Sequence, residues 1–236
     1  MVPSPRVTKL ALNHKLRKTM PPPLTIQKLQ SEATTFARIE SAYPEPTLYG
    51  VTDGKAVGTY LEHKFQAHLK ASYDYVLGNS ATGIDFPGLE VDIKVTSIRQ
   101  PQSSCPFKSA SQKIYGLGYS LLIFVYDKLD DAQTQTARLD LQHVIFVEKH
   151  RTADYQTTSG LRRLLENHAN RDDILAFFEE RMLPVRDMEA QTLAEEVLRR
   201  SPEIGYLTVS NALQWRLQYG RVIEKAGSVD GLLKLT

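Results

Sequence analysis

The stretch GIDFPGLEVDIKVTS, residues 83–97, carries three carboxylates and one lysine in a segment that otherwise has the apolar residues of a β-strand. Apolar and polar residues alternate over residues 89–96, so an extended chain places the apolar side chains on one face and the charged ones on the other. Pro87-Gly88 suits the centre of a tight two-residue turn, which would pair Phe86 with Leu89. The charged face of this predicted hairpin holds four side chains: Asp85, Glu90, Asp92 and Lys94.

Carboxylates gathered on one strand face repel one another and raise their own pKa values unless a cation lies among them. That arrangement predicts a divalent metal site, and oxygen ligands without cysteine or histidine favour Mg²⁺ over zinc. Lys94 would then point at a metal-bound water or at a phosphate. The alternation also fits a second interpretation, the polar outer face of an antiparallel edge strand.

The acid-x-Lys string has little weight alone, because it occurs three times: Asp53-Gly-Lys55, Glu62-His-Lys64 and Asp92-Ile-Lys94. Residues two apart diverge on a helix but share a face on a strand. The third string alone lies in an alternating segment with another acid just before it. We therefore expect the chemistry at Asp92 and Lys94.

Composition is that of a globular chain with one sizeable core. The 236 residues are 42% hydrophobic, and no apolar run approaches the roughly 18 residues of a membrane helix. With a single cysteine, Cys105, neither an internal disulfide nor a cysteine-rich zinc site can form. We expect a cytoplasmic protein.

The net charge of +2 is unevenly distributed. Residues 1–30 contain six basic residues and no acid, namely Arg6, Lys9, Lys15, Arg17, Lys18 and Lys28. A basic, acid-free arm can follow DNA phosphates. A solvated tail and a targeting peptide remain open as alternatives.

Periodicity predicts helices and strands in a mixed order, which indicates an α/β or α+β core. Helices are expected over residues 24–41 and 55–76, and a loop rich in Ser, Gln and Pro over 100–107. The further elements are a short helix at 109–117, strands at 119–127 and 141–149, and helices at 160–182 and 187–200. We divide the chain into a basic arm with a helix (1–45), a catalytic core (46–150) and a helical C-terminal region (151–236).

Two blocks of this sequence resemble the PD-(D/E)XK nucleases, and more closely the MutH-like branch of mismatch-repair nickases and restriction enzymes. KAVGTYLEHKF (55–65) is similar to that branch's helix with an active-site Glu, and DFPGLEVDIK (85–94) is similar to its catalytic hairpin. The resemblance implies a restriction-endonuclease-like mixed β-sheet flanked by helices. It also implies Mg²⁺-dependent phosphodiester hydrolysis leaving a 5′-phosphate.

Residue by residue, the resemblance implies Asp85 and Asp92 as metal ligands, Lys94 as the catalytic lysine and Glu62 as the helix carboxylate beside them. The proline expected before the first Asp is Ile84 here. Lys113 would match a second family lysine and is also expected among the DNA contacts; the alternative is that it faces solvent.

DNA contacts are expected from two places. Arg99, Gln100 and Lys108 follow the catalytic strand in a loop that can reach DNA. The C-terminal segment 206–232 resembles a helix-turn-helix, with a first helix at 211–217 and a second from residue 221. It would present three basic residues to phosphates or guanine edges: Arg216, Arg221 and Lys225. The alternative is a helical hairpin that closes the core with Trp215 buried.

These observations predict a Mg²⁺-dependent, sequence-specific endonuclease of double-stranded DNA, a type II restriction enzyme acting as a homodimer. A repair-type nickase and a non-catalytic DNA-binding protein with a structural hairpin are the alternatives. Asp92→Ala and Lys94→Ala separate the last from the enzymes, because a binding protein would be unaffected.

Overall fold

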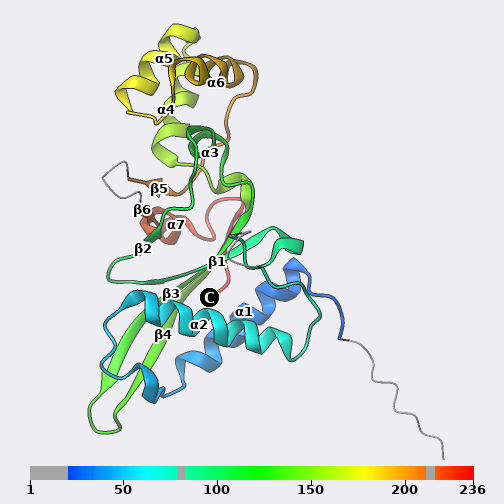
Figure 1. Ribbon diagram of the computed structural model, residues 1–236, viewed down its shortest axis with the longest axis vertical. Helices are drawn as coiled ribbons and strands as arrows, with labels where there is room; N and C mark the ends of the chain where they lie inside the picture. Colours follow the sequence, from blue (N-terminus) through cyan, green and yellow to red (C-terminus); the bar gives the residue numbers. More distant parts are fainter. Residues whose placement is uncertain (1–20, 79–82, 211–215) are drawn as a thin grey trace, which may run out of the picture.

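The computed structural model describes residues 21–78, 83–210 and 216–236. Of the six basic residues of the predicted N-terminal arm, Lys28 lies within the described residues and the other five lie outside them. Figure 1 shows an elongated molecule in which a sheet with two long helices occupies one part and a group of short helices the opposite end. A smaller sheet lies between them.

The main sheet has four strands in the order β1-β3-β4-β7, with β1 parallel to β3 and the other pairs antiparallel. The strands are β1 (Val91–Ser97), β3 (Ser120–Asp131), β4 (Thr136–Val147) and β7 (Leu232–Lys234). The central strand β3 is apolar without interruption over residues 121–126, because it is covered on both faces. Leu122 and Phe124 face one core cluster, while Leu121 and Ile123 face another.

The first core cluster lies between the sheet and two helices, α1 (Ile26–Ser41) and α2 (Gly54–Lys70). Thr25 caps α1 and Asp53 caps α2, each by accepting a hydrogen bond from a main-chain N–H two or three residues on. The expected end of the second helix at residue 76 is wrong, since α2 stops at Lys70. A 3₁₀ turn, Pro46–Leu48, joins the two helices.

The second core cluster covers the other face with a three-stranded antiparallel sheet in the order β2-β6-β5. These strands are β2 (Gln102–Ser104), β5 (Thr208–Val209) and β6 (Arg216–Gln218), and helix α7 (Gly220–Lys225) follows them. The predicted loop at 100–107 therefore contains a strand. Its three-residue length gives too few alternations to be detected from sequence.

The third core cluster belongs to the helices at the far end of the molecule. They are α3 (Ala110–Tyr115), α4 (Tyr155–Glu166), α5 (Arg171–Glu180) and α6 (Asp187–Arg199). The single helix predicted over 160–182 is two helices. Asn170 divides them, because its side chain accepts from the main chain of Asp172 and Asp173 and starts α5 in a capping box.

The predicted second helix from residue 221 is confirmed as α7, but the first helix of the predicted helix-turn-helix is wrong where the structure describes it. Arg216 and Leu217 belong to β6, paired with β2, and the rest of the expected first helix lies outside the described residues, as does Trp215. Leu217 is fully buried between an intermediate Arg216 and an exposed Gln218, the two-residue alternation of a strand. The C-terminal region is thus partly β-structure, and strand pairing with β2 overrides the local helical pattern.

The fold class is confirmed as mixed α+β, with a mixed sheet flanked by helices. Of the helices in the described part of the chain, none combines the length and the apolar character that crossing a membrane requires.

Candidate active site

The predicted catalytic strand is β1, and its two charged side chains meet. Lys94 Nζ lies 2.6 Å from Asp92 Oδ2. Asp92 is 4% exposed, whereas Val91 and Ile93 pack into the first core cluster beside α2. The two-residue alternation therefore places Asp92 and Lys94 on the same face, as predicted.

Asp85 reaches the same place from the segment before β1. Its Oδ2 accepts a hydrogen bond of 2.8 Å from the main-chain N–H of Ile93, and Gln66 Nε2 on α2 lies 3.4 Å from its Oδ1. The bond to Ile93 fixes the carboxylate next to Asp92, because Ile93 is the neighbouring residue on the edge strand of the sheet.

The connection between Asp85 and Asp92 differs from the prediction. Phe86 pairs with Val91 rather than with Leu89, and Pro87–Leu89 form a 3₁₀ turn. A two-residue hairpin turn requires a positive φ at its first central position, which the proline ring forbids. The longer turn places the positive φ at Glu90 instead, at 53°.

Glu90 consequently leaves the charged face. It is exposed and its Oε2 pairs with Lys149 Nζ at 3.0 Å. The expected three-carboxylate face thus contains Asp85 and Asp92 only.

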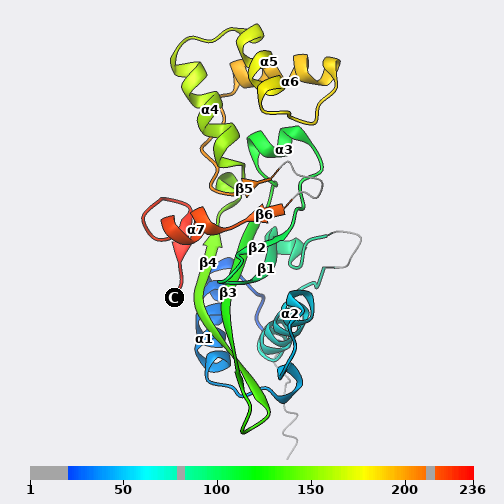
Figure 2. The same cartoon turned by 90° about the vertical axis from the view of Figure 1, so that its left-hand side faces the viewer.

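Glu62 on α2 supplies the third carboxylate. It is close enough to Lys94 and Asp92 for their charges to affect its ionisation. Burial raises the pKa of the Glu62 carboxyl, and the negative charge of Asp92 raises it further, while Lys94 lowers it. Because β1 is the edge strand of its sheet, a helix alongside it can bring a side chain to the catalytic face (Figure 2).

The environment of Asp92 opposes its negative charge. The pKa of Asp92 is raised to about 6, chiefly by burial and also by the contact with Asp85, while Lys94 acts in the opposite direction. The Oδ2 atom of Asp92 is buried, and its close contact is the ion pair with Lys94 rather than a regular hydrogen bond. Buried polar atoms are normally satisfied by hydrogen bonds, so apart from that ion pair this oxygen is available to a ligand.

These residues fit a cation that keeps most of its own water. In the described part of the chain no three His, Cys, Asp or Glu side chains gather closely enough to form a complete protein cage. Mg²⁺ binds through one or two carboxylates plus substrate phosphates and water, which matches a pair of carboxylates with an unsatisfied oxygen.

A groove of about 860 Å³ runs past the site between α2, the end of β1 and β2. Glu62 and Lys94 line it. So do three of the residues expected to contact DNA: Arg99, Gln100 and Arg216. Arg99 is exposed, and its guanidinium contacts Asp127 at 3.1 Å. The structure thus brings together residues predicted separately from the catalytic blocks, the following loop and the C-terminal segment.

The other four expected DNA contacts do not line this groove. Lys108 is exposed on the loop before α3. Arg221 stacks on the Tyr155 ring at 3.7 Å, and Lys225 pairs with Glu224 at 2.8 Å. Lys113 is 2% exposed, so the expectation that it faces solvent is wrong, and burial lowers the pKa of its ammonium group.

Sequence reasoning missed several groove residues. Lys55 adds positive charge, Lys128 lies in the groove paired with Asp130, and Gln102, Ser103 and Ser104 of β2 form one wall. The alternation rule gave no signal for a three-residue strand, and Lys128 lies beyond the strand end predicted at 127.

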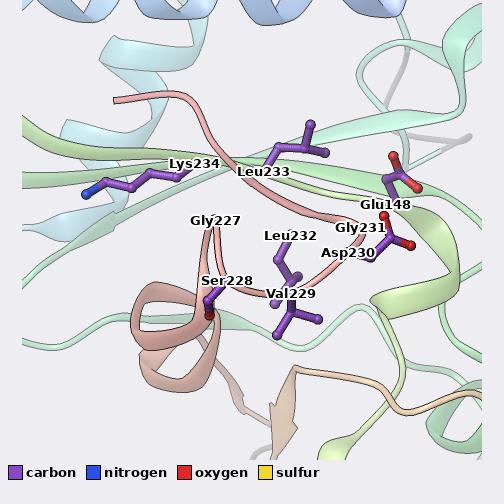
Figure 3. A pocket seen from close by; sticks show the side chains of 9 residues that line it. All are labelled: Glu148, Gly227, Ser228, Val229, Asp230, Gly231, Leu232, Leu233 and Lys234. Atoms are coloured by element: carbon purple, nitrogen blue, oxygen red, sulfur yellow. The ribbon is translucent and has the colours of Figure 1, made fainter.

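A second hollow, of about 470 Å³, lies beside β7 and the turn after α7 (Figure 3). Its walls are Glu148 and residues 227–234, and no predicted site residue belongs to it. Among these two hollows, the first groove alone contains predicted site residues.

Comparison with known proteins identifies the family of the chain. The family model described as "Type II restriction enzyme NspV" matches residues 23–234. The type II restriction enzyme NspV of Nostoc sp. is 64% identical over 210 residues, which are 89% of this chain and 96% of that protein. No solved structure matches the chain significantly. The chain belongs to the type II restriction enzyme NspV family.

Proposed function

We propose that this chain cuts double-stranded DNA at a specific sequence by Mg²⁺-dependent phosphodiester hydrolysis that leaves a 5′-phosphate. As a member of its family it is a type II restriction endonuclease, a site-specific deoxyribonuclease. The observation that carries the catalytic part is the pairing of buried Asp92 with half-buried Lys94, whose side chain opens onto a groove large enough for a phosphate backbone.

The arrangement supports membership of the PD-(D/E)XK superfamily. Asp85 and the Asp92-Ile-Lys94 string are side by side, and Glu62 approaches from a helix. We also propose that the chain belongs to the MutH-like branch, on the similarity of the two blocks at residues 55–65 and 85–94.

Asp85 and Asp92 would hold the metal ion. When bound, the ion lowers the pKa of water and neutralises the charge that develops on the scissile phosphate. Lys94 would orient the attacking water or donate hydrogen bonds to the phosphate oxygens. The raised pKa of Glu62 makes its carboxylate a stronger proton acceptor than an exposed one, so Glu62 would receive a proton from that water.

We further propose a homodimer on DNA and a cytoplasmic location. A two-fold dimer presents one active site to each strand of a palindrome, so both strands are cut in one encounter. The alternative of a repair-type nickase would break a single strand.

The test is incubation of the purified protein with supercoiled plasmid and Mg²⁺, with EDTA and the Lys94→Ala variant as negative controls. Lys149→Ala is the matched variant, since Lys149 also forms an ion pair with a carboxylate of this region but is exposed. We expect discrete linear fragments from the wild type and from Lys149→Ala, and none from the negative controls.

Nicked circles without linear product would favour the nickase. Retained DNA binding without cleavage on plasmids of differing methylation would refute the catalytic proposal and leave the hairpin a structural element.

A further inference from the structure

The small sheet β2-β6-β5 has one polar face. Cross-strand partners point to the same side of a sheet, and here Gln102 is opposite Gln218, Ser104 is opposite Arg216, and Thr208 is opposite Gln218. All the side chains on that side can form hydrogen bonds: Gln102, Ser104, Thr208, Arg216 and Gln218.

The opposite face of this sheet is anchored in the core. Leu217 is fully buried and Val209 is 7% exposed, both in the cluster that packs on β3. Ser103 Oγ lies 2.7 Å from the hydroxyl of Tyr219, which is itself fully buried. The polar face is therefore held outward by packing beneath it.

The polar face borders the catalytic groove. Gln102, Ser104 and Arg216 line the same groove as Glu62 and Lys94. Figure 2 shows β2 and β6 next to the end of β1 and across from α2. A nucleic acid in contact with Lys94 would thus also meet this sheet.

A buried hydroxyl couples the sheet to the catalytic strand. Thr96 Oγ1 accepts from the main-chain N–H of Gln102 at 2.9 Å and lies 3.1 Å from its carbonyl oxygen, to which it can donate. Thr96 is two residues after Lys94 in β1 and is 4% exposed. The positions of Gln102 and Lys94 are therefore fixed relative to each other.

We infer that the polar face of β2, β6 and β5 reads base edges in the major groove of the DNA that the active site cuts. This inference rests on the proposed function. The major groove admits a two-stranded β-ribbon, and β-ribbons read sequence in other DNA-binding proteins. Gln binds adenine through two hydrogen bonds, Arg binds guanine in the same way, and Ser bonds to either.

The composition of the face favours bases over phosphates. Glutamine, serine and threonine carry no charge, so they add nothing to the counterion release that dominates sequence-independent binding, and their hydrogen bonds carry sequence information when they go to base edges. The groove also holds cations for the phosphates in Lys55, in Arg99, which pairs with Asp127, and in Lys128, which pairs with Asp130. The groove thus contains separate groups for positioning the backbone and for reading the sequence.

The experiment first maps the wild-type cleavage site on plasmid DNA. Binding of short duplexes is then measured in EDTA at one fixed salt concentration, with the mapped site, each single base-pair change of it, and an unrelated sequence. The variants are Gln102→Ala and Arg216→Lys; the second keeps the positive charge and removes the two-pronged donor geometry. Gln142→Ala and Arg163→Ala, on exposed residues of β4 and α4, are the matched controls.

We expect each variant to bind the mapped site about 5- to 150-fold more weakly and to lose discrimination at its own base pair, while binding of the unrelated duplex stays within about twofold. In Mg²⁺, each variant should cleave sites altered at its own base pair at a rate close to the rate at which the same variant cleaves the mapped site. The two controls should behave as wild type.

Equal weakening on all duplexes, or unchanged discrimination at every position, would overturn the inference and leave the nuclease assignment intact. A wild-type protein without site-specific cleavage would overturn both.

Discussion

Replacing Asp92 by asparagine should stabilise the metal-free protein at neutral pH. In the folded chain the pKa of Asp92 is raised to about 6 from its ordinary 3.8, chiefly by burial. A folded-state pKa above the unfolded one means that ionisation is harder in the folded state. The penalty is absent below pH 3.8, grows as the pH rises, and is complete above about pH 6.

The magnitude follows from the size of the shift. Roughly two pKa units at about 1.4 kcal/mol each amount to about 3 kcal/mol of unfolding free energy. Asparagine has nearly the same shape and no charge, so it removes this penalty. Lys94 loses its partner, but its side chain is 22% exposed and opens onto the groove, where water can solvate the ammonium group.

The assay is urea unfolding followed by far-ultraviolet circular dichroism in EDTA, from pH 4 to pH 8. We expect Asp92→Asn and wild type to have similar stability at pH 4, and the variant to be more stable by up to about 3 kcal/mol at pH 8. Glu90→Gln is the control, because this exposed carboxylate of the same segment should give no comparable pH-dependent difference.

Added Mg²⁺ should reverse the order. The wild type should gain stability with rising Mg²⁺ at pH 8 and the variant should not, since only the charged carboxylate attracts the ion. If Asp92→Asn is less stable than wild type at pH 8 in EDTA, the ion pair with Lys94 outweighs burial and the reasoning is refuted.

Three further predictions concern the fold and the groove. Gly205→Ala should lower the melting temperature strongly, because the new Cβ would lie 2.1 Å from a main-chain oxygen. Gly220→Ala is the control and should leave the melting temperature nearly unchanged, since its Cβ would meet open space; equal melting temperatures of the two variants would contradict this packing. Thr96→Val should lower the free energy of unfolding in urea by about 1–3 kcal/mol, because it removes the hydroxyl that bonds to Gln102. It should also slow cleavage of the cognate site more than it weakens non-specific binding, and an unchanged cleavage rate would show that β2 holds its position without this hydroxyl. Arg99→Ala should reduce the slope of log binding constant against log salt concentration by about one, the value of one phosphate contact, on cognate and unrelated duplexes alike. A loss of binding confined to the cognate duplex would assign Arg99 to base reading instead.

The local pattern determined much of the candidate catalytic strand and of the core. Alternation over 89–96 placed Asp92 and Lys94 on one face, and the apolar runs located β3 and β4, because the direction of a side chain from an extended backbone depends only on its position in the strand. Helical periodicity likewise located α1 and most of α2, while the caps at Thr25 and Asp53 are seen in the structure.

What the sequence left open depends on contacts between distant segments. The resemblance to nucleases, rather than periodicity, pointed to Glu62, and its approach to Asp92 follows from how α2 packs along the edge strand. Glu90 left the charged face because the proline ring excludes the two-residue turn.

The polar face beside the groove was decided by tertiary structure alone. Ser104 and Arg216 become neighbours only when β2 pairs with β6, and a helical pattern in the sequence concealed the strand. A three-residue strand gains its stability from its partners and from the core beneath Leu217, not from its own propensity. Sequence thus specified which side chains point together within a segment, while tertiary packing decided which segments meet at the site.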